Sequence, residues 1–343
     1  MSDNIRSAYE HTLADLPSYC NLYFAWETSH SVSTKLAYAK DLYIFFNYLI
    51  TKCSDRFSYG IVSDIPLESL KHVNSSDILL YLEYLSSYTV IYPNGTSKTY
   101  SNSGSGKKRK LAPVKNFFRY LKLFNHIDED PTSHIKNPSP NSKAVVILSE
   151  KQQDHLIKEM QTGSRKSERQ LVYHENTKYR DTAILLTFLG TGVRVSELVN
   201  MNIFDIDFEE QCISIIRKGS KKEFVYFNDS VLSILADYID YERRKFIEGK
   251  GDPDANGPLF LSNRGTRISV DRVEGIIKEA AKRVLPENID VSCHTLRKTY
   301  GSYICREYGI HLAQMALGHS DVSTTSKYYI YKDNEQLKDL KNI

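Results

Sequence analysis

Apolar residues recur with helical spacing along most of this chain. In several segments they fall every three or four positions, and Ser or Asp residues that can cap a helix stand at the start of the first two. These segments are 31–52, 76–88, 107–125, 229–248, 270–284, 294–307 and 311–317. Segment 212–227 instead alternates on both sides of Gly219-Ser220, which indicates a β-hairpin. The pattern predicts a mainly α protein with a small antiparallel sheet.

A polar stretch at 127–148 separates two groups of helices. It holds three of the ten prolines and shows little periodicity before Ala144, as is typical of a stiff linker. We therefore expect a helical domain at 18–136, a linker at 137–147 and a second domain at 148–343.

Composition excludes several classes of protein. The chain has 343 residues, of which 41% are apolar and 25% charged, as in ordinary globular proteins. The five cysteines form no C-x-x-C pair, which argues against a zinc ribbon or a disulfide framework and favours a reducing compartment. The first residues are polar and acidic, and no apolar run approaches the ~18 residues of a membrane span. We expect a soluble, cytoplasmic protein that makes no contact with a membrane.

Positive charge is concentrated in one window. Residues 98–122 hold 8 Lys/Arg and no acid, whereas residues 1–97 hold 6 Lys/Arg and 10 Asp/Glu. A solvated helix face, the ordinary alternative, usually mixes both signs because opposite charges at i,i+4 stabilise a helix. A helix with one apolar side and one cationic side can dock on its domain and still contact phosphates. The candidate DNA-binding residues are Lys107, Lys108, Arg109, Lys110, Lys115 and Arg119.

Six residues in five short motifs are candidates for chemistry. They are Arg194 in TGVRVSEL, Lys218 in RKGSKKEF, His294 and Arg297 in HTLR, His319 in LGHSD and Tyr328 in TTSKYY. Each motif alone is weak, since such residues are common on ordinary surfaces. Together they suit metal-free phosphoryl transfer. Guanidiniums bind non-bridging phosphate oxygens, imidazoles add donors, lysine protonates a leaving oxygen and a phenol is a nucleophile. No acidic pair accompanies them to hold magnesium, so we expect neither a metal nor a cofactor.

The order and spacing of these motifs resemble the tyrosine recombinase (phage integrase) family. Its signature has an Arg in T-G-[LMV]-R-x-S-E-L, a hairpin Lys, H-x-x-R, L-G-H, and a Tyr nine residues after that His. Here Tyr328 lies nine residues after His319, and Lys218 lies 24 residues after Arg194. Residues 18–136 resemble the family's helical core-binding domain, and 148–343 its catalytic domain.

The resemblance implies a site-specific DNA recombinase. Tyr328 would attack a DNA phosphate, giving a 3′-phosphotyrosine and a 5′-hydroxyl, and a second strand's 5′-hydroxyl would reseal the backbone without ATP or metal. Tyr329 and Tyr331 are interpreted as structural, and Glu197 as orienting the turn or the arginine.

The same resemblance implies partners. These are double-stranded DNA with inverted-repeat core sites and three further copies of the chain, which together form a tetramer on DNA. An accessory directionality protein is left open. Apolar residues recur every three positions in the tail 333–343, at Leu337, Leu340 and Ile343. We expect this tail to pack on a neighbouring protomer, the alternative being its own subunit.

Three residues depart from the pattern of this family. Arg217 precedes the hairpin lysine, Glu223 stands where a basic residue is common, and Lys298 follows Arg297 where His is frequent. Stretches 88–106, expected to be a hairpin or loop, and 163–178 are insertions that favour a mobile-element enzyme over chromosome dimer resolution.

Three other functions are alternatives to a recombinase. They are a type IB topoisomerase, a catalytically silent DNA-binding protein and a purely structural helical protein, and the last would leave the charge segregation unexplained.

Overall fold

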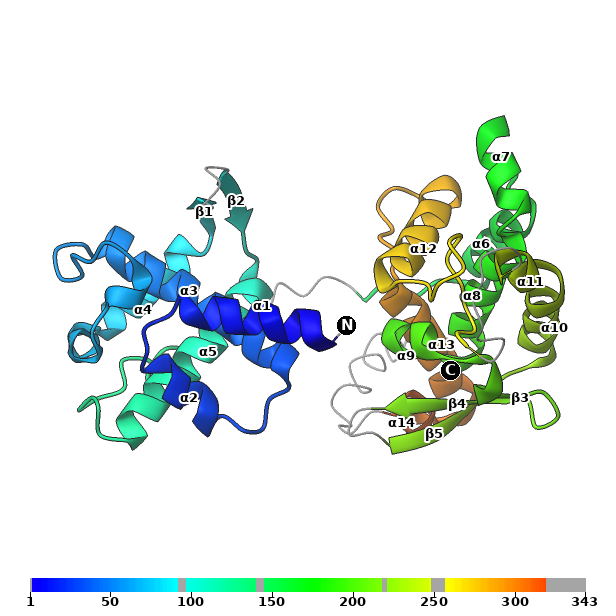
Figure 1. The fold of residues 1–343 in the computed structure, drawn as a ribbon. Helices are drawn as coiled ribbons and strands as arrows, with labels where there is room; N and C mark the ends of the chain where they lie inside the picture. The colour runs from blue at the N-terminus through cyan, green and yellow to red at the C-terminus, as the bar shows by residue number, and fades with distance from the viewer. Residues whose placement is uncertain (1, 92–96, 140–144, 218–220, 248–256, 319–343) are drawn as a thin grey trace, which may run out of the picture. The chain divides into compact units, whose positions relative to one another are not determined.

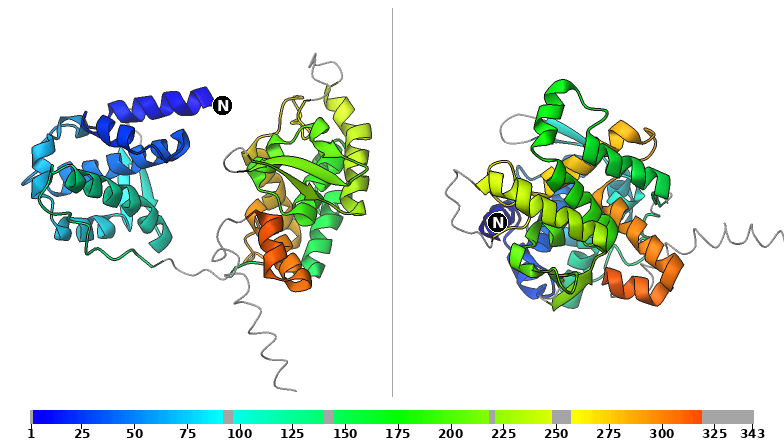
Figure 2. Two further views of the ribbon diagram at one scale, coloured as in Figure 1. Left: turned by 90° about the horizontal axis from the view of Figure 1, so that it is seen from below. Right: turned by 90° about the vertical axis from the view of Figure 1, so that its right-hand side faces the viewer.

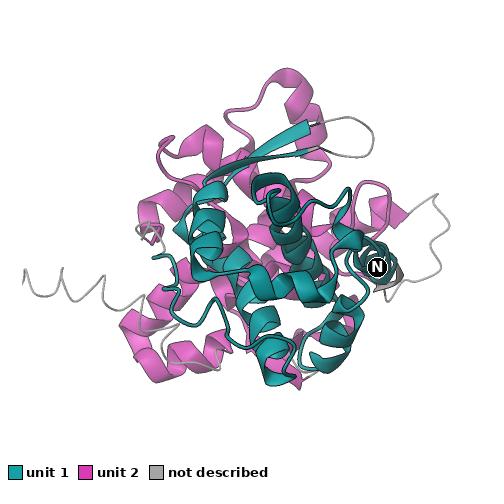
Figure 3. Cartoon of the chain, turned by 90° about the vertical axis from the view of Figure 1, so that its left-hand side faces the viewer, with its two compact units in different colours: residues 1–143 teal, residues 144–343 magenta. Residues whose placement is uncertain are grey.

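The chain folds into two compact units, residues 1–143 and 144–343 (Figure 3). The computed structural model describes residues 2–91, 97–139, 145–217, 221–247 and 257–318. The division between the units falls inside the stretch expected to be a linker, and each unit has its own hydrophobic core. The described elements are mostly helices with two small antiparallel sheets, which confirms the predicted fold class.

The first unit is a helical domain with an aromatic core. Its elements are α1 (Ser2–Ala14), α2 (Cys20–Trp26), α3 (Val32–Lys52), η1 (Val62–Asp64), η2 (Leu67–His72), α4 (Ser75–Tyr84), β1 (Ser87–Ile91), β2 (Ser97–Ser101) and α5 (Gly104–Leu123) (Figure 1). Fully buried rings join α3 to α5, with Phe46 and Phe45 meeting Phe117 and Phe118 edge to face, at 5.8 Å between centroids in each pair. Helix α1 packs along α3, so the unit includes residues ahead of position 18.

The second unit is built around α8. Its elements are α6 (Glu150–Thr162), α7 (Glu168–Glu175), α8 (Lys178–Thr191), α9 (Val195–Asn200), η3 (Ile203–Asp205), β3 (Ile206–Asp207), β4 (Cys212–Arg217), β5 (Lys221–Tyr226), α10 (Asp229–Asp237), the π-helical η4 (Tyr238–Arg243), α11 (Arg244–Ile247), α12 (Val270–Val284), α13 (Cys293–Tyr308) and α14 (Ile310–Leu317) (labelled in Figure 1; two further views in Figure 2). Helix α8 packs against α6, α10 and α13, and the small sheet has the order β3-β4-β5.

Several elements match the expected periodicity, and others differ from it. The helix predicted at 76–88 ends at Tyr84, and Ser87 begins the strand β1. The hairpin expected at 212–227 forms, but Ile206 pairs with Ile213 and adds the third strand β3. The single helix predicted at 229–248 contains a π-helical segment. The polar stretch 163–178 contains the helix α7, which starts where the Gln170 side chain accepts a hydrogen bond from the backbone of Ser167. The stretch 88–106 does form a hairpin, with Ser87 opposite Ser101.

Candidate active site

A glycine turn between α8 and α9 positions Arg194. Gly192 has a φ of +63°, and a Cβ at this position would lie 2.2 Å from a ring carbon of Tyr300. Both the left-handed backbone and the close ring therefore require glycine. The chain leaves this turn extended at Arg194, with φ −76° and ψ 153°, and α9 begins at the next residue.

One buried carboxylate contacts both candidate arginines. Glu197 accepts hydrogen bonds of 2.7 Å from the backbone N–H and from Nη1 of Arg194. Its Oε2 also lies 3.8 Å from Nη1 of Arg297. A carboxylate that bridges two guanidiniums restricts the orientation of each. This arrangement agrees with the interpretation of Glu197 as an orienting residue.

Arg297 ties three segments of the second unit together. It lies on α13 with only 3% of its surface exposed. Its Nη1 donates to the carbonyl of Gly192 at 2.5 Å, and its Nη2 donates to the carbonyl of Leu317. The guanidinium thus joins the α8–α9 turn to the end of α14. Arg194 by contrast keeps 40% of its side chain exposed, so its charge can meet a ligand from solvent.

His294 stands one turn before Arg297, at the start of α13. The residue is exposed to solvent, but partial desolvation lowers the pKa of its imidazole, and the positive charges of Lys298, Arg297 and Arg194 lower it further. Both effects favour the neutral form of the imidazole. A neutral ring can donate a hydrogen bond from one nitrogen and accept a hydrogen bond or a proton at the other.

The structure brings together Arg194, Arg297 and, through its position on α13, His294. Lys218, His319 and Tyr328 lie outside the described residues. The chain reaches Lys218 directly from Arg217, the last residue of β4, and reaches His319 directly from Gly318, which ends α14.

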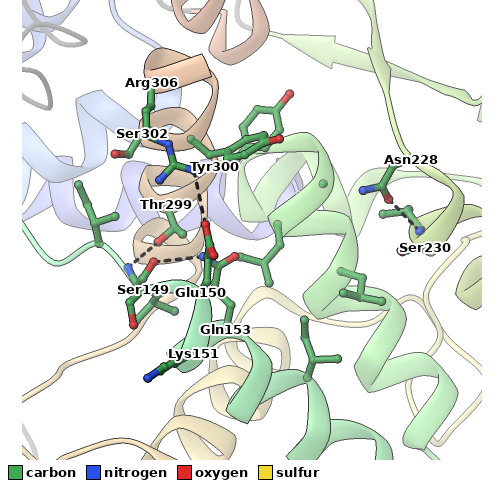
Figure 4. Close-up of a pocket in the computed structure, with 18 of the residues that line it drawn as sticks. Ser149, Glu150, Lys151, Gln153, Asn228, Ser230, Thr299, Tyr300, Ser302 and Arg306 are labelled. Carbon is green, nitrogen blue, oxygen red and sulfur yellow. Dashed lines mark hydrogen bonds and ion pairs between the residues drawn. The ribbon is translucent and has the colours of Figure 1, made fainter. Parts of the chain in front are cut away.

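One pocket of the second unit lies apart from this arginine pair. Among the described residues, no group of three or more His, Cys, Asp or Glu side chains could hold a metal ion. A pocket of about 1270 Å³ lies where the start of α6, the end of α8 and α13 meet (Figure 4). Neither Arg194 nor Arg297 lines it, so it is a separate surface. Within the described ranges, no helix combines the length and hydropathy of a membrane span.

The basic helix α5 uses part of its charge inside the first unit. Lys110 is buried, with Nζ 3.0 Å from Oδ1 of the buried Asp41 on α3. Arg109 also binds this carboxylate, with Nη1 2.5 Å from Oδ2, although half of its side chain is exposed. These two cations therefore stabilise the packing of α5 on α3.

The other cations of α5 differ in their surroundings. The Nζ of Lys107 donates to Oγ of Ser86 at 2.6 Å, and that of Lys115 donates to the carbonyl of Ile135 at 2.5 Å. Lys108 and Arg119 are exposed. Together with the exposed part of Arg109, they present the accessible positive charge among the candidate DNA-binding residues of this helix.

The sequence and the fold are similar to those of known recombinases. Residues 147–335 match the model described as "Phage integrase family". The chain is 31% identical over 329 residues to "Tyrosine recombinase XerC" of Caldanaerobacter subterraneus subsp. tengcongensis, covering 93% of this chain and 84% of that protein. It is 28% identical over 324 residues to "Tyrosine recombinase" of Thermosipho africanus, covering 94% of this chain and 96% of that protein.

Two solved structures share the fold. One is the XerH site-specific recombinase bound to palindromic difH substrate in a post-cleavage complex, with a TM-score of 0.62 and 20% identity, covering 91% of this chain and 80% of that chain. The other is the Tn1549 transposon integrase in complex with circular intermediate DNA, with a TM-score of 0.60 and 16% identity, covering 94% of each chain. The family match and the sequence relatives together establish the assignment. This chain belongs to the phage integrase family of tyrosine recombinases.

Proposed function

We propose that this protein is a site-specific DNA recombinase that cleaves and rejoins DNA strands through a 3′-phosphotyrosine intermediate. The observation that carries the proposal is the pair Arg194 and Arg297 held by the single buried carboxylate of Glu197 in a chain of this family. Two guanidiniums fixed in this way match the charge that develops on the equatorial oxygens of a phosphorane.

Each candidate residue has a role in a balanced first step. The Oη of Tyr328 bonds to phosphorus while the bond from phosphorus to the 5′ oxygen breaks. The ammonium of Lys218 gives its proton to the departing oxygen, which leaves as a 5′-hydroxyl. The phenol's proton passes to an imidazole, for which the neutral His294 is suited.

The second step repeats the first in the opposite direction. The 5′-hydroxyl of another strand attacks the phosphotyrosine, the bond to Tyr328 breaks and the DNA backbone is resealed. Arg194, Arg297 and His319 contact the non-bridging oxygens in both steps. The covalent intermediate keeps the energy of the original phosphodiester, so the cycle needs no ATP.

The first unit supplies a second region of DNA contact. We assign this role to the cationic surface of α5, where Lys108 and Arg119 are exposed. Arg109 keeps 56% of its side chain exposed and can contribute as well. Contacts of this kind position a protein on DNA without selecting its sequence. The target we propose is a pair of inverted-repeat core sites.

Assembly on DNA needs a contact between copies, and the tail 333–343 is our candidate for it. The pocket of Figure 4 is its proposed receptor. Apolar side chains of Ile157, Leu186 and Leu189 line the pocket, together with Lys151 and the ion pair of Arg306 with Glu150. The apolar lining suits the leucines of this segment, and Lys151 suits an acidic residue such as Asp333, Glu335 or Asp339.

Covalent trapping tests the proposed chemistry. A suicide duplex, nicked close to a cleavage position mapped by footprinting, loses the short fragment that carries the 5′-hydroxyl and so retains the protein on DNA. We expect a denaturation-resistant complex with the wild-type chain and with Tyr329→Phe, and none with Tyr328→Phe. A complex formed by Tyr328→Phe would exclude Tyr328 as the nucleophile. Relaxation of a supercoiled plasmid without any core site would point to a topoisomerase instead.

A further inference from the structure

Arg217, the last residue of β4, is a buried cation outside the set of candidate catalytic residues. Only 7% of its surface is exposed. Its Nη1 lies 2.8 Å from Oε2 of Glu223, which stands on the neighbouring strand β5. The same guanidinium donates to the carbonyls of Ala316 at 2.8 Å and of Met315 at 3.4 Å. Glu223 thus fixes a guanidinium that reaches from the hairpin to the end of α14.

Two arginines together bind the carboxyl end of α14. The last carbonyls of a helix have no partner within the helix, and the helix dipole favours a positive charge at this end. Arg217 contacts the carbonyls of Met315 and Ala316, and Arg297 donates to that of Leu317. Three consecutive carbonyls are therefore held by guanidiniums from two other elements, β4 and α13.

The residue that ends α14 is fitted closely against Arg217. Gly318 has a φ of +57°, and a Cβ there would lie 1.8 Å from Nη1 of Arg217. Glycine is thus required both by its backbone conformation and by the guanidinium beside it. Gly318 is bonded to His319, and Arg217 is bonded to Lys218. Arg217 and Gly318, the residues directly before Lys218 and His319, are therefore in direct contact.

We propose that Arg217 is a positioning residue for DNA cleavage. By holding the end of β4 against the end of α14, it fixes the backbone that leads into Lys218. It does this through the peptide carbonyls and without contact with DNA. Arg297 donates to the carbonyl of Leu317 at the same helix end. The ends of β4 and α14 are therefore also fixed relative to the arginine pair. This inference rests on the role proposed above for Lys218.

The test compares two substrates in single-turnover cleavage by the full-length protein. One is the nicked suicide duplex, and the other is the same duplex with sulfur in place of the bridging 5′ oxygen at the scissile phosphate. When the bond from phosphorus to sulfur breaks, the sulfur leaves as a thiolate and needs no proton, because a thiol is far more acidic than an alcohol. Cleavage of the sulfur substrate therefore does not depend on the position of Lys218.

We expect Arg217→Met to slow cleavage of the oxygen substrate by on the order of 100-fold, the effect of a displacement of about 1 Å in a catalytic group. On the sulfur substrate most of this loss should disappear, as it should for Lys218→Ala. Arg217→Lys should recover only part of the rate, because an ammonium cannot reproduce the planar fork of the guanidinium. Arg244→Met, which changes an exposed arginine of the same unit, is the matched control and should match the wild type on both substrates.

Equal losses of Arg217→Met on both substrates would overturn the proposal, since a smaller folded fraction slows both reactions alike. An unchanged rate on the oxygen substrate would overturn it as well. If Arg217→Met fails to fold, Glu223→Gln serves in its place, because 40% of the Glu223 side chain is exposed and the change keeps its shape. It should show a smaller loss with the same rescue by sulfur, and equal losses would again reject the inference. A wild-type chain that forms no covalent complex would instead reject the proposed function itself.

Discussion

At the scale of single residues, the candidate site is defined by how charges are oriented. The Glu197 carboxylate is buried between two guanidiniums and also accepts from the backbone N–H of Arg194, while the guanidinium of Arg297 donates to the carbonyl of Gly192 as well. Removing one partner of such a buried network leaves the other charges uncompensated. The arginines are therefore held before any DNA arrives, as electrostatic catalysis requires.

The protonation of His294 can be measured directly. Burial and the nearby cations disfavour the charged imidazole, so we expect its pKa to lie below the ordinary value of 6.5 and the ring to be neutral at pH 7. A titration of carbon-13-labelled histidines by NMR, with His294→Gln to assign the signal, checks this. Lys298→Gln removes the first of the contributing charges and should move the midpoint upward. A wild-type midpoint at or above 6.5, or no movement in Lys298→Gln, would contradict this account of the site's electrostatics.

At the scale of elements, α5 divides its cations between two tasks. Lys110 and Arg109 hold Asp41 and so stabilise the contact between α5 and α3, whereas Lys108 and Arg119 remain exposed. Residues 98–122 hold no acid, in part because the carboxylate that pairs with Lys110 and Arg109, that of Asp41, comes from α3. Only the exposed share of the charge is available to DNA phosphates.

The salt dependence of DNA binding separates these tasks. If Lys108 contacts a phosphate, Lys108→Gln should reduce the slope of log K against log salt by about 0.9. Lys71→Gln, which changes an exposed lysine elsewhere in the first unit, should leave the slope unchanged. Fluorescence anisotropy with a labelled duplex over a range of salt concentrations measures both. Equal slopes for Lys108→Gln and the wild type would remove Lys108 from the DNA contact.

Local patterns were enough to predict the periodic elements. The amphipathic helices and the hairpin at 212–227 follow from side-chain spacing, and the T-G-V-R turn follows from its glycine. Helix α7 was not predicted, because its eight residues are mostly polar and two of its larger side chains, Val172 and Tyr173, remain exposed. The short strand β3 has too few residues to show a period.

Contacts between distant residues account for what the sequence did not reveal about the site. The motif T-G-V-R-V-S-E-L placed Glu197 beside Arg194, but its approach to Arg297 depends on how α13 packs against the α8–α9 turn. Arg217 stood out only as a departure beside the hairpin lysine. Its contact with the end of α14 spans about 100 residues of sequence, beyond the reach of a local pattern.

At the scale of the whole molecule, two units with separate cores are joined by a polar stretch. Each carries one part of the proposed function, the cationic helix in the first unit and the arginine pair in the second. Strand exchange in addition needs several copies to act together, and this requirement is assigned to the tail and its proposed receptor pocket.

Deleting residues 333–343 tests the proposed assembly. We expect the shortened chain to bind a core site and cleave the suicide duplex, but to form no tetramer on DNA by light scattering and to give no recombinant product. Tyr303→Asp, which changes a half-exposed residue lining the pocket, should produce the same defects with the tail intact. Unchanged recombination by the shortened chain would reject the tail's role. Lower thermal stability with normal assembly would place the tail on its own subunit.

The central claim is that both guanidiniums and the Tyr328 phenol act on one phosphate. The most direct measurement is a crystal structure of the full chain trapped as its covalent complex on the suicide duplex. We predict a bond from Oη of Tyr328 to the 3′ phosphate, with the guanidiniums of Arg194 and Arg297 both within hydrogen-bond distance of that phosphate's non-bridging oxygens. A phosphate linked to another residue, or two guanidiniums that contact different phosphates, would contradict the account.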